Sequence, residues 1–359
     1  MSRRTPLYDK HVAAGGRVVD FAGWEMPVQY TGILDEHRAV RESCGVFDIS
    51  HMGEFFVRGA AAVSWLDGLL TNRVEKLAIG EAQYSLMLNE NGGVIDDLIV
   101  YRIGEVEFLL VVNAGKIDED AAWLQRHLVD GIEFENRSDD YAALAVQGPK
   151  AGEAFERFFA QPLPAERNRV MELPSQTGGR LFAVTTGYTG ELGFEVVFPA
   201  SEAEAIWDQF IAAGVKPAGL GARDTLRLEM CYPLNGSDLS PERTPLEAGL
   251  GFFVDLEKPA FIGRDALLQQ KTAGLPVRLV AIKVQDKCPP IRSHYPVVAN
   301  GEAVAETTSG ALSPSLNCGI AMAYLPIELA KVGQALEIEV RGRRYAASVV
   351  KKPFYQPKP

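Results

Sequence analysis

The chain has 359 residues and a formal net charge of -11, and it is longer than one hydrophobic core usually supports, so we expect two or three domains. An apolar share of 47% and a charged share of 23% are typical of a globular protein and exclude a disordered or fibrous chain. The negative charge argues against nucleic acid as the main partner, because such a partner requires a basic face.

The first seventy residues are predicted to alternate between short helices and strands. Residues 5–31 indicate a short helix, a glycine break, a strand and an aromatic loop, and residues 35–42 indicate a solvent-facing helix. Two strand-like runs, 46–49 and 54–59, place His51 and Met52 in the turn between them. Residues 60–70 have the apolar spacing of a helix.

The next segment predicts an antiparallel sheet. Three strand-like runs, 82–88, 94–101 and 107–114, are too close together for the crossovers that parallel strands need. An amphipathic helix is expected over 114–128. Asn113 ends the apolar run of the third strand, and it is either a turn former or a polar group of a pocket.

The remainder of the chain changes character near residues 271–276. Before this boundary the pattern is α+β, and the predicted elements are strands at 141–149 and 180–199 and helices at 150–159, 202–214 and 219–231. After it, five short strand-like runs separated by turns predict a small all-β sandwich or barrel.

Metal and disulfide chemistry is not indicated. The four cysteines are scattered without a Cys-x-x-Cys pair, and the five histidines lack ligand spacing. Free thiols, together with the lack of an apolar amino-terminal segment or of a run near the roughly 18 apolar residues that span a bilayer, predict a soluble cytoplasmic protein. The few residues before Thr5 leave no room for an organelle presequence.

The stretch NENGGVIDDLIVYR, residues 89–102, places two acids inside an apolar run. Its glycine pair favours a tight turn, and its β-branched residues favour a strand. Because strand side chains alternate between faces, Asp97 shares a face with Tyr101, whereas Asp96 faces the other way. Asp97 is therefore a candidate pocket residue, and the structural alternative is an aspartate that only caps the turn.

Two further motifs place charged residues within predicted strands or helices. Glu195 lies in the apolar strand run GFEVV, where it either receives hydrogen bonds from a ligand or lies on a solvent-exposed edge strand. Arg223 and Arg227 stand four apart on a predicted helix and share a face. They bind either a ligand anion or, by default, a structural partner such as Asp224 or Glu229. The full G-x-G-x-x-G motif is absent, which argues against nicotinamide or flavin binding.

The ordered motifs together resemble a known family. They are DFAGWEMPVQY, GVFDISHMGEF, NGGVIDDLIVY, VVNAG, QGP, TGYTGELGFE, PAGLGARDTLRLE, TSGALSPSL and KKPFY. In this order, from Thr5 to Tyr355, they resemble the glycine cleavage system T-protein family. The resemblance implies an α+β, three-domain, ring-like arrangement with antiparallel sheets. The implied domains are 1–50 with 138–270, 51–137, and an all-β domain at 271–359.

The resemblance also implies an activity and a set of site residues. The family transfers the aminomethyl group on the lipoyl arm of H-protein to tetrahydrofolate, giving methylenetetrahydrofolate, ammonia and dihydrolipoyl H-protein. Asp97 matches the family's catalytic carboxylate. The positions that match folate contacts or pocket-lining residues are Glu195, Arg223, Tyr84, Tyr101, Asn113, Tyr188 and Met52.

The chain departs from the family pattern in two places. Phe252 stands where tryptophan is frequent, and the tail after Tyr355 is only QPKP, without a basic residue that some members have there; both departures bear on contacts to the glutamyl tail of folate. The alternative function is a non-transferring folate-binding protein that maintains iron-sulfur proteins. Such relatives tend to carry a cysteine in the glycine-tyrosine turn, where this chain has Thr186. A transferase domain detached from a flavin-dependent demethylase is a third option, although the chain has no room for a flavin domain.

Overall fold

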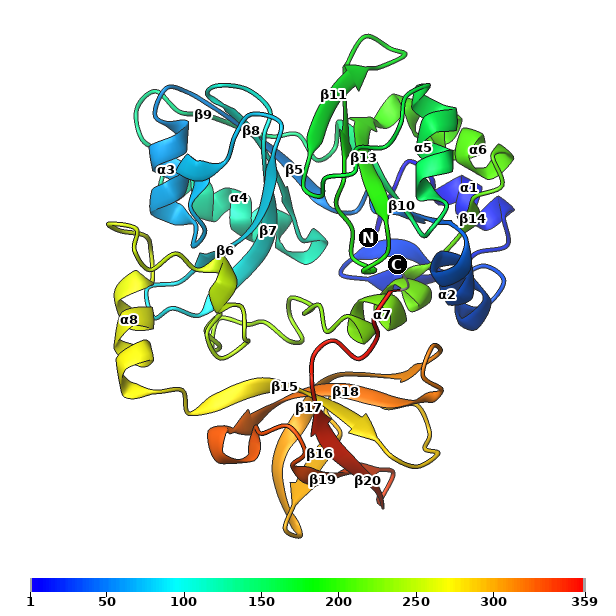
Figure 1. Ribbon diagram of the computed structural model, residues 1–359. Coiled ribbons are helices and arrows are strands. Elements are labelled where there is room, and N and C mark those ends of the chain that lie inside the picture. The colour runs from blue at the N-terminus through cyan, green and yellow to red at the C-terminus, as the bar shows by residue number, and fades with distance from the viewer. Residues whose placement is uncertain (1, 358–359) are drawn as a thin grey trace. The chain divides into compact units, whose positions relative to one another are not determined.

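The computed structural model describes residues 2–357 and shows a mixed α/β protein with antiparallel sheets and one closed barrel (Figure 1). The chain separates into two compact units. Unit 1 holds the described residues up to Asp67, together with Val74–Ser85 and Leu98–Asp224. Unit 2 holds Gly68–Arg73, Leu86–Asp97 and the described residues from Thr225 onward. The predicted division into three domains stays a prediction.

The amino-terminal part of unit 1 carries a small sheet and two helices. The sheet has the order β1-β3-β2, built from β1 (Arg3–Arg4), β2 (Arg17–Phe21) and β3 (Trp24–Gln29). The helices are α1 (Tyr8–Ala13) and α2 (Ile33–Glu42). Both predicted helices are confirmed.

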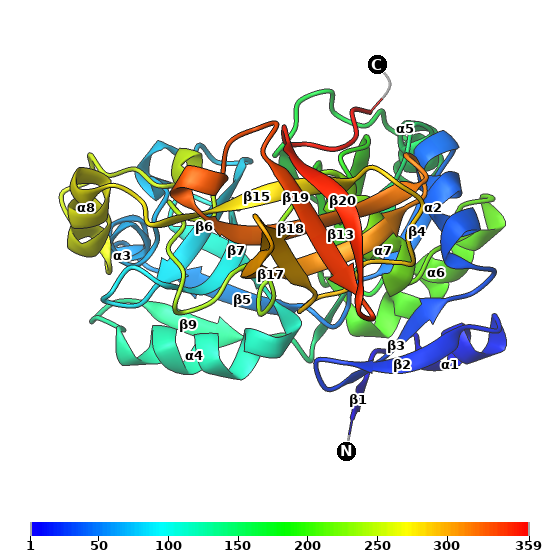
Figure 2. The ribbon, with the colours of Figure 1, turned by 90° about the horizontal axis from the view of Figure 1, so that it is seen from below.

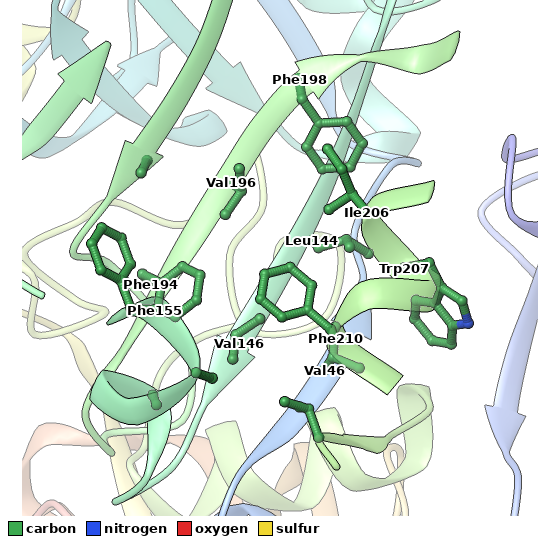
Figure 3. Close-up of a cluster of buried hydrophobic side chains, with 14 of the residues drawn as sticks. Val46, Leu144, Val146, Phe155, Phe194, Val196, Phe198, Ile206, Trp207 and Phe210 are labelled. Carbon is green, nitrogen blue, oxygen red and sulfur yellow. The ribbon is translucent and has the colours of Figure 1, made fainter. Parts of the chain in front are cut away.

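A six-stranded sheet forms the larger core of unit 1. Its order is β11 (Val170–Pro174), β12 (Arg180–Val184), β13 (Gly193–Pro199), β10 (Tyr141–Gln147), β4 (Gly45–Asp48) and β14 (Lys216–Pro217). Helices α5 (Ala151–Phe159) and α6 (Ala203–Ala212) cover one face. Phe155 and Phe210 from these helices pack on Phe194 and other strand residues (Figure 3). Apolar burial of this kind stabilises the sheet by about 25 cal/mol per Å².

A second large sheet has five strands in the order β6-β7-β8-β5-β9. Its strands are β5 (Gly53–Arg58), β6 (Ala82–Leu88), β7 (Val94–Arg102), β8 (Glu107–Val112) and β9 (Glu133–Asn136). Helices α3 (Ala62–Leu69) and α4 (Ile117–Arg126) lie in the connections. Strands β6 and β7 each pass from one unit into the other. Strand β8 pairs in antiparallel fashion with both β7 and β5, as predicted from the short connections.

Unit 2 contains helix α8 (Arg264–Ala273) and the closed barrel. The barrel strands, in order, are β15 (Val277–Val284), β18 (Cys318–Pro326), β17 (Glu302–Ser313), β16 (Pro296–Ala299), β19 (Ala335–Val340) and β20 (Arg343–Val350). Strand β19 pairs over its whole length with β20, and β20 closes the barrel on β15 (Figure 2). The predicted all-β segment is therefore a barrel.

Helix α7 (Leu220–Glu229) and several short 3-10 helices complete the fold. These short helices are η1 (Val74–Lys76), η2 (Ala114–Lys116), η3 (Ala200–Glu202), η4 (Gly251–Phe253) and η5 (Ile327–Leu329). The predicted helix over 114–128 is thus split into η2 and α4. Phe252 on η4 is 92% exposed.

The prediction that the helix containing residues 35–42 faces solvent is wrong for part of its surface. Glu36, His37 and Val40 on α2 are buried. Glu36 accepts hydrogen bonds from the backbone N–H groups of Tyr30 (2.6 Å), Thr31, Gly32 and Gly219 (2.9 Å). A buried carboxylate is tolerated when it receives such bonds. The local charge pattern could not show this, because Gly219 is remote in sequence.

We expect Glu36→Ala to lower the free energy of unfolding by about 3 kcal/mol or more, because four N–H groups lose their acceptor. Glu36→Gln should lower it less, since its amide oxygen can replace one carboxylate oxygen. Urea unfolding of both variants against the wild type measures the difference. A loss below about 1 kcal/mol for the alanine variant would contradict the structural role of Glu36.

Candidate functional site

The turn before β7 is built by glycines and by Asn89. Gly92 has a φ of +82°, and a Cβ on Gly93 would lie 1.7 Å from the carbonyl oxygen of Pro241. The Asn89 side chain accepts hydrogen bonds from the N–H groups of Asn91 (3.0 Å) and Gly93 (2.9 Å). The first glycine supplies a left-handed backbone and the second allows a close approach. Together they set where β7 begins.

Strand β7 separates its two aspartates by burial. Asp96 is 0% exposed and shares its face with the buried residues Leu98 and Val100, whereas Asp97 and Ile99 are half-buried. This alternation follows from the two-residue period of a strand. Asp97 therefore lies on the more accessible face, as the parity of the sequence predicts.

Strands β8 and β5 of unit 1 extend the sheet face on which Ile99 of β7 lies. Ile99 pairs with Val111 on β8, and Val111 pairs with Glu54 on β5. Directly paired residues of an antiparallel sheet point to the same side. In the next row Tyr101 pairs with Leu109, which pairs with Phe56. Glu54 thus belongs to the row of the half-buried Ile99 and neighbours the tightly packed row of Tyr101.

The face of the six-stranded sheet that α5 and α6 do not cover packs against this face of the five-stranded sheet. Phe56 packs against Tyr141 and Phe182, with ring centroids 5.3 and 6.2 Å away. On β13, Val197 pairs with Phe182, so Glu195, two residues earlier, points to the same side. Because β13 lies between β12 and β10, the alternative that Glu195 occupies an edge strand is wrong. Glu195 points into the space between the two sheets.

A chain of hydrogen bonds crosses that space. The Tyr101 hydroxyl is hydrogen-bonded to Thr186, and the Thr186 hydroxyl donates to a Glu195 carboxylate oxygen. Burial, followed by the nearby charge of Glu195, raises the pKa of Tyr101 well above its usual value. The Tyr101 hydroxyl therefore stays protonated at physiological pH. Thr186 lies between Tyr101 and Glu195.

Arg223 brings a positive charge to the same region. Its guanidinium lies 4.9 Å from the centre of the Tyr188 ring, a cation–π distance. Its Nη1 atom is buried and has no hydrogen-bonding partner among the described residues. Burial lowers the pKa of Arg223, and the charge of Glu195 opposes that shift.

Arg227 has a structural partner, as the default assignment of the arginine pair predicts, and that partner includes Asp238. In unit 2, Arg227 forms a buried ion pair with Asp238 at 2.8 Å, and Glu229 accepts hydrogen bonds from Ser313 and Ser315. The two arginines therefore differ in role. Arg227 is structural, whereas the Nη1 atom of Arg223 keeps no hydrogen-bonding partner among the described residues.

Two buried side chains of this region were not predicted from the sequence as site residues. His51 is 2% exposed, and burial, reinforced by Arg223 against the opposing effect of Asp48, lowers its pKa to about 4. Its Nδ1 atom has no hydrogen-bonding partner in the described chain. Glu54 is fully buried, and both its carboxyl oxygens also have none. Since buried polar atoms are nearly always hydrogen-bonded, such atoms mark a surface suited to a polar ligand.

The structure places the predicted site residues as follows. Seven are half-buried, namely Met52, Tyr84, Asp97, Asn113, Tyr188, Glu195 and Arg223, and Tyr101 is buried. Tyr101, Tyr188, Glu195 and Arg223 lie together in unit 1. The backbone carbonyl of Asn113 accepts a bond from Lys116 N–H, and the Asn113 side chain does not cap η2. The roles of Met52, Tyr84 and Asn113 stay predictions.

The described residues contain no group of three or more His, Cys, Asp or Glu side chains suited to hold a metal ion. Within residues 2–357, no helix combines the length and apolar character needed to cross a membrane.

Two family models match the chain. The GCVT N-terminal domain matches residues 7–258, and the glycine cleavage T-protein C-terminal barrel domain matches residues 278–356. Three proteins named aminomethyltransferase are similar over 99% of this chain. They come from Desulfitobacterium hafniense strain DSM 10664 / DCB-2 (45% identity, 98% of the relative covered), Picosynechococcus sp. strain ATCC 27264 / PCC 7002 / PR-6 (46%, 98%) and Geobacillus thermodenitrificans strain NG80-2 (45%, 99%).

A solved structure gives the same result. The crystal structure of glycine cleavage system aminomethyltransferase T from Bartonella henselae has a TM-score of 0.94 and 35% identity to this chain. The match covers all of this chain and 99% of that one. Full-length similarity in sequence and in fold accords with the two family models. The chain belongs to the glycine cleavage T-protein family.

Proposed function

We propose that the protein is a tetrahydrofolate-dependent aminomethyltransferase of the glycine cleavage system. Its donor is the aminomethyl group on the lipoyl arm of H-protein, and its products are methylenetetrahydrofolate, ammonia and dihydrolipoyl H-protein. The observation that carries the proposal is the accessible carboxylate of Asp97. It lies on the strand face that, four residues later, presents Tyr101 to Thr186 and Glu195.

The side chains in unit 1 suit a folate. Such a molecule combines a nitrogen heterocycle, which donates hydrogen bonds, with a glutamyl tail, which carries carboxylates. Glu195 supplies a carboxylate acceptor, and Arg223 supplies an unpaired guanidinium donor. Hydrogen bonds that involve a charged group are stronger than neutral ones. Tyr188, held beside Arg223, adds an aromatic surface.

Asp97 has the chemistry that one-carbon transfer requires. Its carboxylate stabilises positive charge that develops on the transferred carbon and accepts a proton from the attacking amine. Its half-buried position strengthens this electrostatic effect relative to bulk water. The remaining rate enhancement comes from holding two substrates in a reactive orientation.

The alternative of a non-transferring folate-binding protein is less well supported. The turn between β12 and β13 contains Thr186, and its hydroxyl bridges Tyr101 and Glu195. A cysteine there, as in the iron-sulfur relatives, would be a much weaker donor to the carboxylate. The similar proteins are also named for transfer.

We expect Asp97→Asn to reduce kcat by about 100-fold or more, because the amide keeps the shape and loses the charge. The dissociation constant for tetrahydrofolate should stay within about threefold of wild type. Asp96→Asn is the matched control, since Asp96 points to the buried face. Its folded fraction should retain kcat, while its melting temperature falls. The assay follows methylenetetrahydrofolate and ammonia from aminomethyl-loaded H-protein, and near-normal turnover by Asp97→Asn would refute the catalytic role.

For Glu195→Gln we expect the dissociation constant for tetrahydrofolate to rise by about 10- to 100-fold, because a charged acceptor becomes neutral. Thr186→Val should weaken binding less, since it removes only the hydroxyl that orients Glu195. Isothermal titration with tetrahydrofolate measures both. Wild-type binding without either product would favour the non-transferring alternative, and unchanged affinity of Glu195→Gln would remove Glu195 from the folate site.

A further inference from the structure

Glu54 is held in place by its backbone. Its N–H group donates to Ser138 Oγ at 3.0 Å, and its carbonyl oxygen accepts from the N–H of Arg137 at 2.9 Å. Strand β5 also lies inside its sheet, between β8 and β9. The side chain is 0% exposed. These backbone bonds keep the Glu54 side chain on the inner face of the sheet.

The surroundings of the Glu54 carboxyl group are largely apolar. Glu54 lies in the same cross-strand row as Val111 and Ile99. The neighbouring row on this face of the sheet contains Phe56 and Tyr101. The Tyr101 hydroxyl is already hydrogen-bonded to Thr186. Neither carboxyl oxygen has a partner among the described residues. A buried carboxyl group in this state costs stability, whereas leucine at the same position would not.

The protonation state of Glu54 follows from this burial. Desolvation raises its pKa well above the usual value of a glutamate. A neutral carboxylic acid presents one O–H donor and one carbonyl acceptor side by side. Such a pair matches the edge of a heterocycle in which an N–H group stands next to a carbonyl oxygen or a ring nitrogen.

We propose that Glu54 is a folate-binding, specificity-determining residue whose carboxyl group exchanges two hydrogen bonds with the ring system of the substrate. This inference rests on the proposed function. The hydrocarbon and sulfur part of the lipoyl arm does not fit the same position, because it offers no adjacent donor and acceptor. Glu54 belongs to the row of the half-buried Ile99 and neighbours the packed Tyr101 row, so a flat ring would approach it from the side of Ile99.

The test compares Glu54→Gln with Glu54→Leu. The amide keeps one donor and one acceptor, so its dissociation constant for tetrahydrofolate should stay within about threefold of wild type. Leucine keeps the volume and removes both groups, so its dissociation constant should rise about 10- to 100-fold. The leucine variant should nonetheless melt no lower than wild type at pH 8. Weaker binding without loss of stability separates a ligand contact from a structural role.

The melting temperature should also depend on pH in a defined direction. In wild type the folded state holds the Glu54 proton, whereas the unfolded state releases it above about pH 4.3. Wild type therefore loses stability relative to Glu54→Gln as the pH rises from 5 to 8. The gain in melting temperature of Glu54→Gln should be larger at pH 8 than at pH 5. A constant difference would contradict a neutral Glu54.

The outcomes distinguish this inference from the proposed function. If wild type binds tetrahydrofolate and forms product while Glu54→Leu binds equally well, Glu54 is not a ligand contact and only the present inference fails. Glu54→Gln binding as weakly as the leucine variant also overturns it. Wild type that binds no tetrahydrofolate would refute both. Glu54→Met serves as a second apolar variant if the leucine variant does not fold.

Discussion

The packing of the two large sheets of unit 1 against each other is the constraint on which the site depends. Phe56 and Phe182 join the inner faces, and the polar side chains next to them must find partners in a space that excludes water. Tyr101, Thr186 and Glu195 satisfy one another across this space. His51, Glu54 and Arg223 retain buried polar atoms without partners in the described chain. The same packing that stabilises the unit thus produces its binding capacity.

Rigid backbone supports these side chains. The turn that carries Thr186 and Tyr188 is held by Gln147, whose amide donates to the Thr186 carbonyl oxygen and accepts from the Thr189 hydroxyl at 2.9 Å. Arg41 donates to the Thr189 carbonyl oxygen at 2.7 Å and forms a buried ion pair with Glu191 at 2.8 Å. A preorganised turn of this kind costs little further ordering when a ligand binds. Stability and binding therefore share the same hydrogen bonds.

The site combines a negative charge, on Glu195, with a positive charge, on Arg223. The carboxylate of Glu195 favours the cationic form of Arg223, whereas burial disfavours it. Burial keeps His51 neutral. The positive charge of this region therefore comes from Arg223 and not from His51. Opposite charges held apart from each other can bind a ligand that presents donors at one end and carboxylates at the other. This arrangement supports the proposal of a folate, rather than a simple anion, as the ligand.

The sequence by itself determined the local elements, the alternation of Asp96 and Asp97, the barrel strands and the family motifs, because these depend on residues close together in the chain. Only the tertiary structure decided which charges are structural. The pairing of Arg227 with Asp238, the four N–H groups around Glu36 and the interior position of β13 all involve segments that are distant in sequence. Glu54 is the clearest case. Its charge in an apolar strand run was visible in the sequence, but its isolation arises only when the two sheets pack and exclude water.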